Sequence, residues 1–196
     1  MALETATVVE AHRSIEPLAE EWAELAERTH AVPFAHPGWI SAWFDAFGDG
    51  RPPLILAARD GDRLAGVLPL VDAGRRLRSP TNTHTPSFEL IAQDGDVARD
   101  LVADLFGRGF QELDLGYMDP AGPLYTCVSE MGAECAARML PGATMRSPYV
   151  SLEGDFDAFR AGLTRNFRRG LGDGAEFFDP HQYQPSGSRR LGAGRE

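Results

Sequence analysis

Residues 53–71 read Pro-Leu-Ile-Leu-Ala-Ala-Arg, then Asp-Gly-Asp, then Arg-Leu-Ala-Gly-Val-Leu-Pro-Leu-Val, and this stretch decides the fold class. Its two apolar runs, 53–59 and 63–71, predict two strands. The Asp60-Gly61-Asp62 segment between them is typical of the tight turn of a β-hairpin. The stretch therefore predicts an antiparallel hairpin near the middle of the chain.

The sequence before the hairpin predicts one strand and two helices. Residues 5–11 predict the strand, and Ser14 is placed to cap the helix that follows. That helix has one apolar face, formed by Leu18, Trp22 and Leu25. A second, compact helix is predicted from five closely spaced apolar side chains: Trp39, Ile40, Trp43, Phe44 and Phe47.

The sequence after the hairpin continues to alternate. Strands are predicted at 88–92, 112–117 and 145–152, with helices that begin at Asp96, near residue 122 and at Asp155. The last helix carries an apolar stripe: Phe156, Phe159, Leu163 and Phe167. This alternation around one hairpin predicts an α/β fold, more closely an α+β fold with a mixed sheet and helices on its faces. We expect one domain over 1–170 and a disordered tail over 171–196.

Composition narrows the function classes. The net charge is −10, and the acidic excess lies in residues 1–140. An acidic body argues against nucleic acid as the partner, because phosphate binding needs a basic surface. No apolar run approaches the roughly 20 residues of a membrane-spanning helix, and no secretory signal is visible, so we expect a cytoplasmic protein without a membrane span.

The spacing of metal-binding residue types predicts no metal site. The two cysteines, Cys127 and Cys135, are eight positions apart, which is neither a metal nor a redox spacing. Both fall on an apolar stripe of the helix predicted over 122–139. We interpret them as two small core residues, with a reactive thiol as the alternative.

Four segments together resemble a known family. They are Pro33-Phe34-Ala35-His36-Pro37-Gly38-Trp39 with Ala42-Trp43, Leu64-Ala65-Gly66-Val67-Leu68-Pro69-Leu70, Ser79-Pro80-Thr81-Asn82-Thr83-His84-Thr85-Pro86, and Leu163-Thr164-Arg165-Asn166-Phe167-Arg168-Arg169. In this order, and with the predicted order of elements, the chain resembles GNAT-superfamily acyltransferases of the CelD-like type, which are related to cellulose biosynthesis proteins and to FemAB. The resemblance spans about residues 8–170.

The resemblance implies a GNAT-like acyl-CoA N-acyltransferase fold and the front, N-terminal half of a tandem arrangement. The front half would be structural or face the substrate, a small-molecule or amine acceptor. The back half would hold acetyl-CoA or another acyl-CoA. We expect a truncated polypeptide that lacks the back half and is inactive alone.

The acyl-CoA signature of the family is missing from its expected place. It resembles Arg/Gln-x-x-Gly-x-Gly/Ala and brings backbone amides to the pyrophosphate at a helix N-terminus. The nearest candidate before the helix at Asp96 is Ala92-Gln93-Asp94-Gly95-Asp96, whose two aspartates would repel phosphate. We therefore expect no tight binding of acyl-CoA to this chain.

A second hypothesis comes from a different class of function. The aromatic helix around Trp39 and Trp43 could form the contact surface of a non-catalytic interaction module. A missing second half would also leave apolar surface uncovered, including the Phe156–Phe167 stripe, so we expect self-association.

Three residues are candidates for proton transfer. His84 lies in a polar loop, where it could be a base, contact a substrate, or only bond to neighbouring backbone. Glu89 and Asp114 each stand between apolar residues on predicted strands. Each could be a general base or a solvent-facing side chain.

Four residues near the end of the resemblance are candidates for substrate binding: Arg165, Asn166, Arg168 and Arg169. Their guanidinium groups could contact an anionic substrate or the phosphates of CoA. The alternative is the solvated face of a helix.

Overall fold

The computed structural model describes residues 7–144 and 154–170. The chain divides into two compact units, Met1–Ala143 and Thr144–Glu196. The strands of the first unit are β1 (Val8–His12), β2 (Pro53–Asp60), β3 (Arg63–Asp72), β4 (Arg76–Arg78), β5 (Ile91–Ala92) and β6 (Glu112–Asp114). Its helices are α1 (Ala19–Arg28), α2 (Pro37–Phe47), α3 (Gly95–Gly107) and α4 (Pro123–Glu134), with short 3₁₀ turns at Glu16–Leu18 and Pro33–Ala35.

The central hairpin is confirmed. β2 pairs antiparallel with β3 from Pro53↔Val71 to Asp60↔Arg63, with an irregularity between Ala58 and Arg59. Gly61 adopts a φ of 59° in the turn, a conformation that glycine reaches without steric cost. The six strands form one sheet in the order β1-β2-β3-β4-β6, and β5 pairs with β3. The sheet is mixed because β4 and β6 are parallel.

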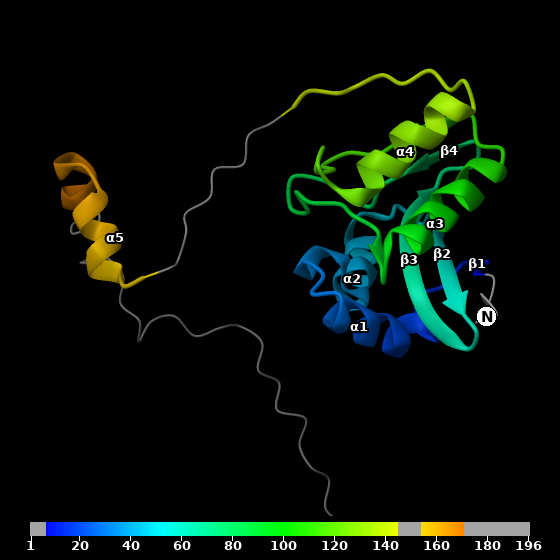
Figure 1. Ribbon diagram of the computed structural model, residues 1–196, viewed down its shortest axis with the longest axis horizontal. Coiled ribbons are helices and arrows are strands. Elements are labelled where there is room, and N and C mark those ends of the chain that lie inside the picture. The colour runs from blue at the N-terminus through cyan, green and yellow to red at the C-terminus, as the bar shows by residue number, and fades with distance from the viewer. Residues whose placement is uncertain (1–6, 145–153, 171–196) are drawn as a thin grey trace, which may run out of the picture. The chain divides into compact units, whose positions relative to one another are not determined.

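Helices cover both faces of this sheet (Figure 1). On β2, Leu54 and Leu56 pack into the core beneath α3 and α4, whereas Ile55 and Ala57 pack into the core with α1 and α2. Two-sided burial explains why the strand is apolar at consecutive positions, since neighbouring side chains point to opposite faces. The prediction of a mixed α/β sheet with helices on its faces is therefore confirmed.

The predicted buried face of α1 and the existence of the aromatic helix α2 are also confirmed. Leu18, Trp22 and Leu25 are each buried, and the Trp22 indole donates a hydrogen bond of 3.0 Å to the carbonyl of Ala35. In α2, Ile40 and Trp43 are buried, while Trp39 and Phe47 remain partly exposed. Ser14 does not cap a helix as predicted, because its hydroxyl bonds to the Glu16 carboxylate instead of a backbone amide.

Helix α3 packs closely on β3 at Gly66. A Cβ atom at this position would lie 2.6 Å from Cγ1 of Val97 and 2.9 Å from Cδ1 of Leu101. Real Cβ atoms do not approach other atoms so closely, so the glycine is required for this helix–sheet distance. The contact fixes where α3 begins relative to the sheet.

Several predicted boundaries are wrong. The strand predicted over 88–92 is regular only at Ile91–Ala92, and the one over 112–117 ends at Asp114. Helix α4 stops at Glu134, so Cys135 is exposed rather than in the core, while Cys127 is partly buried. Burial raises the pKa of the Cys127 thiol, which is unfavourable for a reactive thiolate.

In the second unit, Asp155 caps α5 (Phe156–Gly162) by accepting a hydrogen bond from the amide of Ala158. The predicted long helix is interrupted, because Leu163 is extended with a ψ of 152° and helical structure resumes over 165–170. The predicted strand at 145–152 and the predicted tail at 171–196 both lie outside the described residues. Across 7–144 and 154–170, no helix is long and apolar enough to cross a membrane.

Candidate functional site

A groove of about 400 Å³ lies where the end of α1, strand β5 and the first residues of α3 and α4 meet. Its lining is mostly apolar and small, with two carboxylates among the described residues. Residues from several segments line it, among them Val32, Glu89, Asp94, Gly95 and Pro123. This volume is within the usual range for small-molecule pockets.

Glu89 is the predicted candidate that lies in the groove. Its Oε1 accepts hydrogen bonds from the amide of Leu90 at 3.0 Å and from the amide of Leu124 at 2.9 Å. Leu124 is the second residue of α4, and the N-cap residue of that helix is Gly122, which has no side chain to cap it. Glu89 therefore caps α4 from a distant part of the sequence.

The surroundings of Glu89 shift the pKa of its carboxyl group upward. Burial raises the pKa of the Glu89 carboxyl, and the negative charge of Asp119 raises it further, while the two backbone hydrogen bonds oppose the rise. A carboxyl group with a raised pKa is better suited to exchange a proton near neutral pH than an exposed glutamate. Of the three predicted proton-transfer candidates, Glu89 has this combination of burial and a neighbouring groove.

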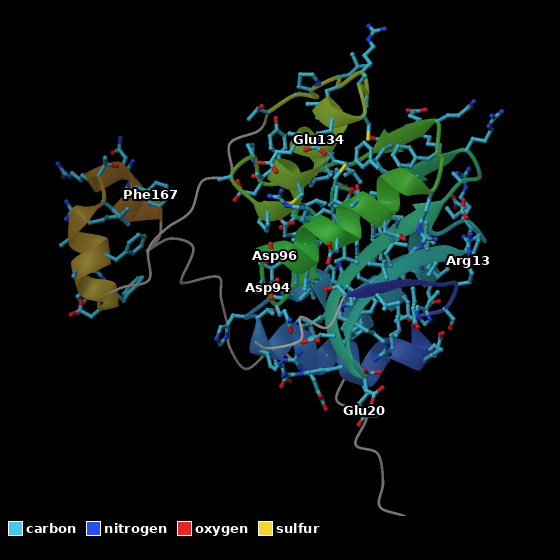
Figure 2. The ribbon with its side chains drawn as sticks, turned by 45° about the vertical axis from the view of Figure 1, so that its right-hand side comes forward. Arg13, Glu20, Asp94, Asp96, Glu134 and Phe167 are labelled. Atoms are coloured by element: carbon cyan, nitrogen blue, oxygen red, sulfur yellow. The ribbon has the colours of Figure 1, made fainter. Side chains whose placement is uncertain are left out.

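The second carboxylate belongs to Asp94 at the start of α3. Its Oδ1 accepts a hydrogen bond of 2.9 Å from the amide of Val97, so Asp94 is the N-cap and not Asp96 as predicted. The helix begins at Gly95, which places Asp96 inside its first turn. Figure 2 shows Asp94 and Asp96 close together at the start of α3.

His84 lies at a different place, beside the aromatic helix. Its imidazole stacks on Phe47 with 6.0 Å between ring centroids, and its backbone amide donates to Oδ1 of Asn82. The indole of Trp39 packs edge-on against Phe34 and donates a hydrogen bond to the buried hydroxyl of Thr85. We call Phe34, Trp39, Phe47 and His84 the aromatic surface.

Asp114 lies on β6 and is exposed. Its Oδ2 accepts a hydrogen bond of 2.7 Å from Arg76 on the neighbouring strand β4. An exposed ion pair at the end of a sheet is an ordinary surface feature. Within the described residues, no hydrogen bond or ion pair joins His84, Glu89 and Asp114 to one another, so they do not form one catalytic constellation.

The predicted substrate-binding residues lie in the second unit. Arg165, Asn166, Arg168 and Arg169 are all exposed within the helical stretch 165–170. No hydrogen bond organises their side chains into a binding site in the described part of the chain.

A second cavity, of about 260 Å³, is lined by Arg13, Asp72 and Arg108 among others. Both of its arginines are already paired, Arg13 with Asp72 and Arg108 with Asp104. Residues 7–144 and 154–170 contain no group of three or more His, Cys, Asp or Glu side chains placed to hold a metal ion.

Sequence reasoning identified Glu89 and the aspartates, but not the groove that joins them. Thr29–Val32 and Pro123 were not recognised as its other walls, because they come from segments far apart in the chain. Pro123 directly after a glycine was the available signal for a helix start that lacks its own cap.

Neither the models of known families nor the curated proteins yielded a match to this sequence.

Proposed function

We propose that this chain supplies the acceptor-facing domain of an acyl-CoA-dependent N-acyltransferase of the CelD-like GNAT type. Acetyl-CoA, or another acyl-CoA, is then held by a different domain, of the same polypeptide or of another. The observation that carries the proposal is the capping of α3 by Asp94.

A helix N-terminus binds phosphate through free backbone amides and the positive end of the helix dipole. In α3 the amide of Val97 is already bonded to Asp94, and Asp96 adds a second negative charge in the first turn. Both charges oppose a pyrophosphate at the position where a GNAT-like domain would hold it. The order of the elements and the mixed sheet are compatible with such a fold.

Calorimetric titration of the full chain with acetyl-CoA tests this proposal. We expect no saturable binding and no acetyl transfer by the chain alone. A 1:1 isotherm with micromolar affinity, about −8 kcal/mol, would overturn it. The matched variant Asp94→Ser/Asp96→Ser keeps a capping hydroxyl and removes both charges, so it should bind CoA more tightly than the wild type if these carboxylates keep phosphate away.

A second candidate function is a non-catalytic interaction module that uses the aromatic surface. The exposure of Trp39 (39%) and Phe47 (41%) beside the stacked His84 favours it. Sedimentation velocity over a concentration series tests self-association through this surface. A Phe47→Ser variant should then associate less than the wild type, and Leu140→Ser, at an exposed apolar position outside the aromatic surface, is the matched control.

A further inference from the structure

Three phenylalanines are exposed on a short part of the second unit, residues 154–170, which we call the α5 segment (Figure 2). Phe156 is 62% exposed, Phe159 38% and Phe167 60%. The rings of Phe156 and Phe159 lie 6.3 Å apart, so they form one apolar patch on α5. Large apolar side chains that gather in the open mark a surface that binds another apolar surface.

The charge of the α5 segment is opposite to that of the first unit. The segment holds four arginines and two aspartates, Asp155 and Asp157, which give it a net charge of +2. Both aspartates precede Ala158, so residues 158–170 carry four positive charges and no negative one. Residues 1–143 hold 22 carboxylate side chains and 11 arginines, a net charge of −11. In an acidic protein, positive charge therefore lies on the segment that also exposes the phenylalanines.

The arginines of the α5 segment are available to an anion from outside the protein. They are all exposed: Arg160, Arg165, Arg168 and Arg169. Among residues 7–144 and 154–170, none of their guanidinium groups forms an ion pair or a side-chain hydrogen bond. Guanidinium groups bind phosphate through two parallel hydrogen bonds. The segment thus offers apolar rings and phosphate-binding groups together.

The backbone of the α5 segment favours a lipid surface over a groove in a partner protein. Phe156 and Phe159 belong to α5, whereas Phe167 follows Leu163, which is extended with a ψ of 152°. A helix that fills a protein groove places its apolar side chains at i, i+3, i+4 and i+7 along one continuous helix. Leu163 interrupts that spacing. A bilayer surface imposes no such spacing, because each apolar side chain enters the headgroup region by itself.

We propose that the α5 segment binds the surface of a bilayer that contains anionic phospholipids. The phenylalanine rings enter the boundary between headgroups and acyl chains, and the guanidinium groups bond to lipid phosphates. Repulsion of the acidic first unit by the same surface is screened beyond a Debye length, about 8 Å at physiological ionic strength. Binding of this kind needs no membrane-spanning helix, and it is independent of the proposed function in acyl transfer.

Cosedimentation of the full chain with lipid vesicles tests the proposal. The probes are vesicles of phosphatidylcholine alone and vesicles in which about one third of the lipid is phosphatidylserine. We expect the partition coefficient to be about tenfold or more higher for the anionic vesicles. It should fall as the salt concentration is raised from about 0.05 to about 0.5 M, because salt screens the attraction.

Two pairs of matched variants separate the α5 segment from the rest of the protein. Phe156→Ser removes an exposed ring, and Leu140→Ser removes an exposed apolar side chain from the first unit. Arg168→Glu reverses a charge on the segment, and Arg63→Glu makes the same change at an exposed position of the first unit. We expect each segment variant to lower the partition coefficient about fivefold or more, and each control to leave it within about twofold. All four positions are exposed, so the fold should tolerate the changes.

A fluorescence measurement separates entry of the rings from adsorption by charge alone. The three tryptophans of the wild type all lie in the first unit, so Phe159→Trp adds a reporter to the α5 segment. Lipids brominated in their acyl chains quench tryptophan that lies among them. We expect such lipids to quench more of the fluorescence of Phe159→Trp than of the wild type.

Equal binding to the two kinds of vesicle, equal loss with segment and control variants, or no additional quenching of Phe159→Trp would overturn the proposal. So would a chain that does not sediment with anionic vesicles but self-associates, or binds an acidic protein, through the α5 segment. None of these results bears on the proposed function, which the titration with acetyl-CoA tests separately.

Discussion

Helices α3 and α4 begin at the same groove but are capped in different ways. Helix α3 is capped by Asp94, three residues before the amide that it binds. Helix α4 begins after Gly122 and Pro123, and its amide at Leu124 is bound by Glu89, a residue 35 positions earlier in the chain. The first cap is local, whereas the second exists only when two distant segments are brought together.

This difference links the start of α4 to the integrity of the groove. A local cap forms whenever its own turn forms, so α3 can be stabilised before the domain has assembled. The cap on α4 needs the loop that carries Glu89 to be in place. Any change at Glu89 therefore acts on a residue that also stabilises a helix.

The largest effect is expected where the distant cap is displaced. In Gly122→Ala, the new Cβ would lie 2.3 Å from Oε2 of Glu89 and 3.1 Å from the Asp119 carbonyl oxygen. We expect a loss of about 1–3 kcal/mol in the free energy of unfolding, since Glu89 must move and Leu124 loses its partner. Urea denaturation measures this loss as a lower midpoint at unchanged slope.

Gly95→Ala is the matched control, because it lies at the first position of α3 with no atom within 4 Å of its new Cβ. We expect it to be neutral or slightly stabilising. If both alanine variants were equally stable, the distant cap would contribute nothing measurable and the comparison between the two helices would fail.

A smaller effect is expected from removing the local cap. Asp94→Ala leaves the Val97 amide without its carboxylate partner and should lower stability by about 0.5–2 kcal/mol. Asp96→Ala removes the same charge from the same turn without removing a side-chain cap, and should lower the free energy of unfolding by less than Asp94→Ala. Thermal denaturation of the two variants gives the ranking, and a larger loss for Asp96→Ala would mean that Asp96 is the cap after all.

The smallest effect is expected in how the free energy of unfolding depends on pH. Burial raises the pKa of Glu89 in the folded protein, so the folded state holds this proton more tightly than the unfolded chain. The stabilisation that comes from this raised pKa is fully present below the ordinary glutamate pKa. It is lost as pH rises through the pKa of Glu89 in the folded protein. Relative to the wild type, Glu89→Gln should therefore gain stability as pH rises from about 4 to about 7.

Urea denaturation of both proteins across this range measures that difference, in which the other titrating groups largely cancel. Asp114→Asn is the control, because Asp114 is exposed and paired with Arg76 at the sheet edge. A difference between wild type and Glu89→Gln that stays constant with pH would contradict a raised pKa at Glu89.

The sequence predicted the elements whose signals are local. The hairpin at 53–71 and the buried face of α1 follow from apolar spacing, and both are confirmed. The cap of α3 was assigned to Asp96 rather than Asp94, since two aspartates flank Gly95 and either is a good capping residue. The break at Leu163 was missed because the aromatic spacing continues across it.

The sequence by itself determined the mixed α/β class, because strands and helices have periods of two and 3.6 residues that can be read locally. It also determined which residues were chemically notable, among them Glu89, Asp94 and His84. Tertiary structure decided their grouping. It placed Glu89 and Asp94 at one groove and left His84 and Asp114 elsewhere. Contacts between residues 35 positions apart depend on how strands pair and helices pack, and no local pattern in the sequence encodes that geometry.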